Sequence, residues 1–233
     1  MDNFTDGAVR FEKVTKKFGN ITALEDVSFE IKGGDFVFIT GPSGAGKTTI
    51  AKLILREITP SSGSVKIDEV DLAKLSSGKI PGLRRKIGVV FQDFKLLSGR
   101  TVFENVSLPL EVVGTDGNEI KKNVSEILEL VGLEERANLF PAQLAGGELQ
   151  RACLARAIIG KPKIVLADEP TGNLDPTTSW QIVKLLKKIN KLGTTIIMST
   201  HNVDIVNTLK ERVIEVDKGK VVKTQEAGKY EAT

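Results

Sequence analysis

The sequence predicts an α/β protein with a largely parallel β-sheet, and three observations lead to this prediction. Apolar segments with strand character alternate along the chain with segments whose apolar residues recur at helical spacing. A glycine-rich stretch, residues 41–46, lies between one such strand and one such helix. A middle segment, from Thr101 to about Gly160, shows little strand character. Strands that alternate with helices form parallel sheets covered on both faces, so the middle segment is interpreted as a helical insertion.

The first 40 residues predict three strands. Apolar and polar residues alternate over residues 9–14 and again over residues 27–31, as in strands with one buried face. The run Phe36–Ile39 is wholly apolar, which is typical of a strand buried on both faces. Gly33 and Gly34 are expected to form the turn before it.

The remaining elements follow the glycine-rich stretch. A helix is expected directly after Gly46, a second from near Asn118 to Val131 with Gly132 as its stop, and a third from Gly146 or Gly147 onward. The polar tail, Lys223–Thr233, is expected to fray. Five further strands are predicted, at Ser64–Ile67, Ile87–Phe91, Ile164–Ala167, Thr195–Ser199 and Arg212–Val216.

The composition narrows the class of protein. With 233 residues, 40% hydrophobic and 27% charged, the chain has an ordinary globular composition. Its single cysteine excludes an internal disulfide and a thiolate zinc site, and its single histidine excludes a multi-histidine metal site. The net charge of +3 is too small to predict a nucleic-acid partner. No apolar run approaches the roughly 20 residues that span a bilayer and no secretory signal is visible, so we expect a cytoplasmic protein.

The glycine-rich stretch has the P-loop pattern Gly-Pro-Ser-Gly-Ala-Gly-Lys-Thr. A phosphate-binding loop needs a strand before it and a helix after it, and both are predicted here. Backbone N–H groups and the helix N-terminus would bind phosphate oxygens, the Lys47 ammonium would reach the outer phosphates, and the Thr48 hydroxyl can ligate Mg²⁺. The alternative, a chance glycine-rich turn, is disfavoured by this context. The candidate ATP-binding residues are Gly41, Pro42, Ser43, Gly44, Ala45, Gly46, Lys47, Thr48 and Thr49.

Two adjacent carboxylates, Asp168 and Glu169, end the predicted strand Ile164–Ala167. In a parallel sheet this strand end lies at the same edge as the P-loop. Asp168 is then expected to orient Mg²⁺, and Glu169 to polarise an attacking water. The alternative, an N-cap pair for the next helix, is less favoured beside a P-loop.

Between these motifs lies Leu144-Ala-Gly-Gly-Glu-Leu-Gln-Arg151, which resembles the signature motif of the ATP-binding cassette (ABC) superfamily. Other superfamily elements stand in the expected order: Phe18 at the adenine-stacking position, Gln92 in the Q-loop, Asp175 in the D-loop and His201 as the switch histidine. The resemblance covers nearly the whole chain. It implies an ABC nucleotide-binding domain, with a P-loop (RecA-like) core, an antiparallel β subdomain and an inserted helical subdomain. The implied single domain is 1–233, with the core at 1–92 and 161–233 and the insertion at 93–160.

The resemblance also implies roles for these residues in binding and hydrolysing ATP with Mg²⁺. Gln92 and Asp168 would complete the metal shell with Thr48, and Glu169, His201 and Gln92 would act in hydrolysis. The implied unit is a head-to-tail homodimer that closes on ATP. The superfamily usually has serine where this chain has Ala145. Alanine lacks the hydroxyl that donates to the γ-phosphate across the dimer, so we expect weaker ATP-driven closure of the dimer. The residues implied to contact the nucleotide of the second copy are Ala145, Gly146, Gly147 and Glu148.

Within the superfamily, the segment from Phe91 to Leu110 resembles the FtsE group, the ATPase subunits of the bacterial FtsEX cell-division complexes. This implies an integral membrane, FtsX-like partner, a link to the cell-division machinery and a place at the inner face of the cell membrane. Phe94, Leu96 and Leu97 are expected either to line a groove for a short helix of that partner or to pack the insertion against the core.

Two alternative functions stay open and a third is disfavoured. An ATPase of a lipoprotein-release or macrolide-export transporter stays open, because such ATPases share parts of the segment described above. A nucleotide-gated binding module with residual hydrolysis also stays open, because Ala145 weakens the signature motif. ABC ATPases of DNA maintenance carry long insertions, for which this chain has no room.

Overall fold

A parallel sheet forms the centre of the computed structural model, which describes residues 5–228 and 230. Within this range its six strands follow the order β10-β9-β3-β8-β7-β6, and every neighbouring pair is parallel except β10 with β9. The α/β prediction is therefore confirmed. The strands are β3 (Phe36–Thr40), β6 (Ile87–Phe91), β7 (Ile164–Asp168), β8 (Thr195–Ser199), β9 (Arg212–Asp217) and β10 (Lys220–Gln225).

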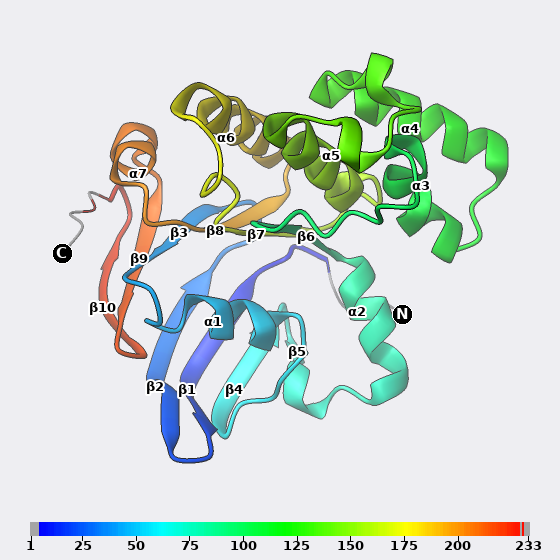
Figure 1. The fold of residues 1–233 in the computed structure, drawn as a ribbon. Coiled ribbons are helices and arrows are strands. Elements are labelled where there is room, and N and C mark those ends of the chain that lie inside the picture. Colours follow the sequence, from blue (N-terminus) through cyan, green and yellow to red (C-terminus); the bar gives the residue numbers. More distant parts are fainter. Residues whose placement is uncertain (1–4, 229, 231–233) are drawn as a thin grey trace.

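The two faces of this sheet are buried in two different hydrophobic clusters. Along β3, Val37 and Ile39 join the cluster that contains α1, whereas Phe36 and Phe38 join the cluster that contains α5, α6 and α7. Figure 1 shows α5 and α6 on one side of the sheet and α1 on the other. Burial on both faces explains why β3 is wholly apolar. The helices are α1 (Lys47–Ile54), α5 (Gly146–Ile158), α6 (Pro176–Asn190) and α7 (Val203–Leu209).

A second sheet, antiparallel and ordered β2-β1-β4-β5, packs on the α1 side. The rings of Phe11 and Phe29 stack across its first two strands with their centroids 4.5 Å apart. This sheet is the β subdomain that the fold prediction expects. Its strands are β1 (Val9–Phe18), β2 (Ile21–Ile31), β4 (Ser62–Ile67) and β5 (Val70–Asp71).

Helices α3 (Val102–Val112), α4 (Gly117–Val131) and α5 share a third cluster, between β6 and β7 in the chain. α4 ends at Val131 and is capped by Gly132, whose φ of 67° is left-handed, as expected for a glycine that stops a helix. α3 was not predicted, although Thr101 and Glu104 form a capping box at its start. The remaining helices are α2 (Ile80–Arg85) and the 3₁₀ turns η1 (Leu72–Lys74), η2 (Ser77–Lys79), η3 (Glu134–Arg136) and η4 (Pro141–Gln143).

The prediction of a frayed tail from Lys223 is wrong for the residues that can be described. β10 pairs with β9 as far as Gln225, and the Tyr230 side chain is 5% exposed. A tight turn at Lys218 and Gly219 joins the two strands, and both residues have positive φ, as a type I′ hairpin turn requires. Positions 229 and 231–233 of the predicted tail lie outside the described residues. None of the described helices combines the length and apolar character needed to cross a membrane.

Candidate active site

The P-loop joins the end of β3 to the start of α1. Gly41 and Gly46 have φ angles of 138° and 116°, in the region that favours glycine. A Cβ atom at Gly41 would lie 2.0 Å from the Val216 carbonyl oxygen, so the loop lies close against β9. Because α1 begins at Lys47, the free N–H groups and the positive end of this helix are at the loop.

The Lys47 ammonium lies within this loop. Its Nζ donates hydrogen bonds to the carbonyl oxygens of Gly41 (2.7 Å) and Pro42 (3.0 Å), and it lies 3.9 Å from Oε1 of Glu169. The side chain is only 9% exposed. Phosphate oxygens can replace these neutral acceptors with stronger, charge-assisted hydrogen bonds.

Thr48 and Asp168 come together from the start of α1 and the end of β7. Thr48 Oγ1 lies 3.5 Å from Asp168 Oδ2, while the hydroxyl of Ser199, at the end of β8, donates to Asp168 Oδ1. Mg²⁺ prefers hard oxygen ligands and usually keeps several waters besides one or two carboxylates and phosphate oxygens. A hydroxyl beside a carboxylate therefore fits Mg²⁺ that arrives with a nucleotide. Sequence reasoning missed Ser199, although it is the polar end of an apolar strand.

Gln92 follows β6 and lines the same region, but its amide is engaged elsewhere. Its Nε2 lies 3.4 Å from Oδ1 of Asn173, and the Asn173 amide lies 3.5 Å from the Gln92 carbonyl oxygen. Within residues 5–228 and 230, no group of three or more His, Cys, Asp or Glu side chains could hold a metal by itself. The assignment of Gln92 to a metal shell stays a prediction.

Glu169 is held in an unusual backbone conformation beside His201. Its φ is 48°, and its N–H lies within hydrogen-bonding distance of the carbonyl (3.1 Å) and hydroxyl (3.2 Å) oxygens of Ser199. Its Oε2 lies 2.8 Å from Nδ1 of His201, the residue that follows β8 by two positions. The carboxylate is 17% exposed and the imidazole 68%. The strained φ thus holds a nearly buried carboxylate between a lysine and a histidine at the sheet edge.

One cavity of about 660 Å³ collects most of the predicted residues. Ala23 and Tyr230 also line this cavity, and sequence reasoning missed both because no motif contains them. Gly41 and Ala45 are not among its lining residues, and neither is Phe18, which is 47% exposed at the end of β1 with Lys16 Nζ 4.9 Å from its ring centre. The predicted residues that line it are Pro42, Ser43, Gly44, Gly46, Lys47, Thr48, Thr49, Gln92, Asp168, Glu169 and His201.

The signature residues lie outside this cavity, in a separate hollow at the start of α5. Gly146, Gly147 and Asp175 line that hollow. Ala145 occupies the N-cap position without a side-chain cap, and its N–H donates to the Glu148 carboxylate (2.9 Å). Glu148 also pairs with Arg136, Nε to Oε1 at 2.9 Å. These two contacts lower the pKa of the Glu148 carboxyl below its ordinary value, and the hydrogen bond from the Ala145 N–H contributes most.

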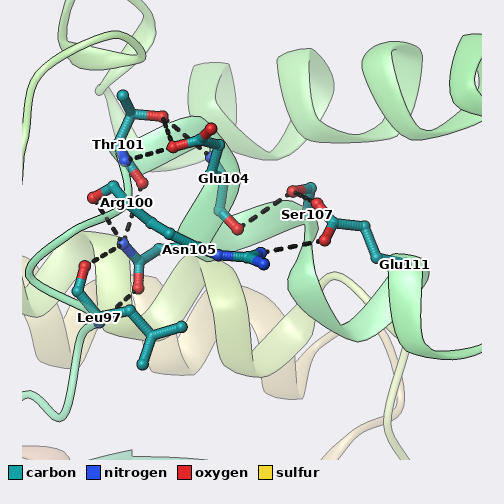
Figure 2. Close-up of polar contacts among 7 residues, drawn as sticks. All are labelled: Leu97, Arg100, Thr101, Glu104, Asn105, Ser107 and Glu111. Atoms are coloured by element: carbon teal, nitrogen blue, oxygen red, sulfur yellow. Dashed lines mark hydrogen bonds and ion pairs between the residues drawn. The ribbon is translucent and has the colours of Figure 1, made fainter.

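The segment after Gln92 is fixed from two sides. Phe94 and Leu96 pack against the core clusters, whereas Leu97 is 44% exposed. Two of the three apolar residues therefore pack the insertion against the core, and only Leu97 is free to meet a partner. Figure 2 shows the buried Asn105 beside the segment: Oδ1 accepts from the Leu97 N–H (2.8 Å), and Nδ2 lies 3.0 Å from the Leu97 carbonyl oxygen. The same Nδ2 lies 3.1 Å from the carbonyl oxygen of Arg100. The segment therefore has a defined shape.

Comparison with known proteins gives a consistent result. The ABC transporter family model matches residues 24–172. The cell division ATP-binding protein FtsE of Bacillus subtilis is 51% identical over 223 residues, which cover 95% of this chain and 98% of that protein. FtsE of Mycobacterium tuberculosis is 45% identical over 224 residues (95% and 97%), and FtsE of Escherichia coli is 43% identical over 212 residues (91% and 96%).

Solved structures agree with the sequence relatives. The dimeric post-hydrolysis state of the ATP-binding cassette MJ0796, bound to ADP and Pi, has a TM-score of 0.86 and 39% identity, and the match covers 95% of this chain and 100% of that one. CbiO1 of Clostridium perfringens, part of an ABC transporter complex, has a TM-score of 0.88 and 31% identity, with coverage of 96% and 90%. The chain is thus an ATP-binding, ATP-hydrolysing protein. It belongs to the ABC transporter family of ATPases and, within that family, to the FtsE group.

Proposed function

We propose that two copies of this chain close on ATP and drive an FtsX-like membrane protein in bacterial cell division. One observation carries the proposal most directly: Lys47, the Thr48–Asp168 pair and the Glu169–His201 pair converge at one edge of the sheet. The similarity to FtsE proteins over 95% of the chain supports the cell-division role. On this proposal the chain lies in the cytoplasm, at the inner face of the membrane, and has no nucleic-acid partner.

Hydrolysis needs positioning and charge neutralisation rather than covalent chemistry. Lys47 would move its hydrogen bonds from the loop carbonyls to phosphate oxygens. Thr48 and Asp168 would hold Mg²⁺, which neutralises phosphate charge when bound. Glu169 would orient the attacking water, and His201, 2.8 Å away, would hold that carboxylate and contact the γ-phosphate.

The separate signature hollow supports a head-to-tail dimer. Gly146 and Gly147 form the first turn of α5 and line a different hollow from Lys47. Their N–H groups bind a phosphate at the positive end of a helix, but only a nucleotide held by a second copy would bring one there. Because Ala145 has no hydroxyl, backbone groups would carry this contact.

A second cavity supports the place of the membrane partner. This cavity, about 540 Å³, extends from the nucleotide site along α1 and β6 to the segment after Gln92. Ala51, Leu55, Val89 and Phe91 give it apolar walls. A short amphipathic helix of an FtsX-like protein would place its apolar face in such a groove.

Turnover of ATP by the purified chain tests the catalytic part of the proposal. Glu169→Gln keeps the shape of the side chain but removes its charge, so kcat should fall by roughly 10²-fold or more. Asp204→Asn, which changes an exposed carboxylate in the first turn of α7, is the matched control and should retain kcat. Equal rates for the parent and Glu169→Gln would instead favour the nucleotide-gated binding module, which the alanine at position 145 also favours.

The membrane partner is tested by co-expression in bacteria. We expect the chain to co-purify with the FtsX-like protein encoded by its own source, and not with the membrane subunit of a lipoprotein-release or macrolide-export transporter. Co-purification with such a transporter subunit, and not with the FtsX-like protein, would instead support a role in transport.

A further inference from the structure

Ser199 ends β8 beside the two carboxylates of the nucleotide site. β8 pairs in parallel with β7, and Ser199 lies opposite Asp168 in the register of the two strands. The residue is only 7% exposed, and a buried hydroxyl needs hydrogen-bond partners within the protein. Its partners therefore show what this side chain does at the edge of the sheet where ATP is proposed to bind.

The Ser199 hydroxyl connects both acidic residues of the site. It donates to Oδ1 of Asp168 at 2.5 Å, the separation of a charge-assisted hydrogen bond. A second acceptor, the Ala167 carbonyl oxygen, is 3.4 Å away. A hydroxyl has a single proton to donate, so the shorter contact with the carboxylate takes it. The hydroxyl oxygen is left to accept from the Glu169 N–H, at 3.2 Å.

The bond to Oδ1 fixes the orientation of the Asp168 carboxylate. The other oxygen, Oδ2, lies 3.5 Å from Thr48 Oγ1, and these two atoms are the proposed protein ligands of Mg²⁺. Rotation of an aspartate carboxylate about its last torsion is broad and roughly twofold, so an unbonded carboxylate would turn away easily. A donor that holds one oxygen keeps the other directed at Thr48.

Glu169 depends less on this hydroxyl. Its N–H also lies 3.1 Å from the Ser199 carbonyl oxygen, a contact that a change of the Ser199 side chain does not remove. Its carboxylate lies between Lys47 and His201. Loss of the hydroxyl should therefore disturb the metal ligand Asp168 first, and the residue that orients water much less.

We propose that Ser199 is a positioning residue for the metal site, whose hydroxyl holds Asp168 Oδ2 beside Thr48 before ATP and Mg²⁺ arrive. This role rests on the proposed function, which assigns Asp168 and Thr48 to Mg²⁺. Hydrogen-bonded partners of metal ligands orient these ligands, and their loss typically lowers metal affinity about 10- to 100-fold. The P-loop does not use this hydroxyl, so ATP without metal should bind equally well in its absence.

Ser199→Ala removes only the hydroxyl. The probe is Mn²⁺, which prefers the same oxygen ligands as Mg²⁺. It is titrated into the ATP-bound protein, with protein in excess over ATP, and free Mn²⁺ is measured by electron paramagnetic resonance. The Kd for Mn²⁺ should rise about tenfold or more, while the Kd for ATP in EDTA stays within twofold of the parent value. In turnover, the Mg²⁺ concentration for half-maximal rate should change more than kcat.

Two further variants separate this role from a general effect on the fold. Asp168→Asn should weaken Mn²⁺ binding by itself, and Ser199→Ala should add little to it in the double variant, because both act on one ligand. Ile196→Val is the control for packing. Ile196 is buried in the same strand but packs in the cluster on the other face of the sheet, so this variant should lower the Tm and leave the Kd for Mn²⁺ unchanged.

The outcomes distinguish this role from the proposed function. A Kd for Mn²⁺ within twofold of the parent in Ser199→Ala overturns the role of Ser199 and leaves the proposed function standing. Equal losses of Mn²⁺ binding and of ATP binding in EDTA also overturn it, because they would show general damage to the site. If the parent itself holds Mn²⁺ no more tightly than free ATP does, the proposed metal site is wrong and the role of Ser199 fails with it.

Discussion

The guanidinium of Arg156, in the signature helix α5, donates hydrogen bonds to the carbonyl oxygens of Lys95 (2.7 Å) and Phe94 (3.1 Å). These two carbonyls belong to the turn that follows Gln92, where both residues have positive φ, 48° and 60°. A turn of two non-glycine residues in this conformation is strained and needs external support. The signature helix supplies that support directly.

Arg156→Lys should release this turn, because a single ammonium cannot reproduce the fork of the guanidinium. We expect the free energy of unfolding to fall by about 2 kcal/mol. Amide hydrogen exchange at residues 94–97 should become faster than in the parent. Arg151→Lys, on the same helix, is the matched control and should leave exchange at these residues unchanged. Unchanged exchange in Arg156→Lys would contradict the prediction.

Cys153, one turn before Arg156 on α5, donates its thiol to the Phe94 carbonyl oxygen at 2.9 Å. Burial raises the pKa of this thiol to about 12. Because only the thiolate is nucleophilic, the native protein should not react with a thiol reagent at pH 7 or 8, whereas the denatured chain should react with one equivalent. Fast reaction of the native protein at pH 8 would show that the helix opens readily at this point.

Ala145→Ser restores the hydroxyl that the signature motif usually has. The new side chain can cap α5 and donate to a phosphate in the facing copy, a contact of about 1–3 kcal/mol. Because a head-to-tail dimer makes this contact twice, its dissociation constant should fall by at least roughly 30-fold.

Sedimentation in a Glu169→Gln background, where ATP persists, measures this constant. Ala142→Ser changes an exposed alanine three residues earlier and should have no effect. No gain in dimerisation for Ala145→Ser would show that backbone groups alone complete the contact.

Glu148→Ala removes the carboxylate that holds the Ala145 N–H and pairs with Arg136. The loss of one cap should cost about 1 kcal/mol in the free energy of unfolding at pH 7. The folded-state pKa of Glu148 is lowered, so this contribution is present above the ordinary carboxyl pKa of about 4.3 and disappears as pH falls through the lower, folded-state value. Denaturation of parent and variant at pH 7 and at pH 3 measures the difference. A larger difference in the free energy of unfolding at pH 3 than at pH 7 would contradict this prediction.

Leu97→Ser tests whether the segment after Gln92 contacts the membrane partner. Leu97 is 44% exposed, so the substitution should leave the Tm nearly unchanged while it weakens co-purification with the FtsX-like protein. Leu96→Ser, in contrast, should lower the free energy of unfolding by about 2–4 kcal/mol, because Leu96 packs in two clusters. Leu192→Ser, at a leucine that is 76% exposed beyond α6, is the control for both measurements. Full partner binding by Leu97→Ser would exclude this residue from the contact with the partner.

Much of the fold could be read from local patterns. The buried strand before the P-loop, the helix up to Val131 and the strand ends at Asp168 and Ser199 follow from apolar runs and glycine stops. The α3 helix was missed because Pro109 and a mixed apolar pattern obscure it. β10 was missed because its side chains are mostly exposed, so no alternation of apolar and polar residues marks it.

The sequence alone determined the class of this protein, because a P-loop, paired carboxylates and a single histidine in a fixed order identify an ABC ATPase. Only the tertiary structure decided which residues support that chemistry. Arg156 bonds Lys95 across 61 residues of the chain, and Ser199 bonds Asp168 across 31. No local pattern encodes such contacts, because the elements that form them meet only when the sheet and its helices assemble.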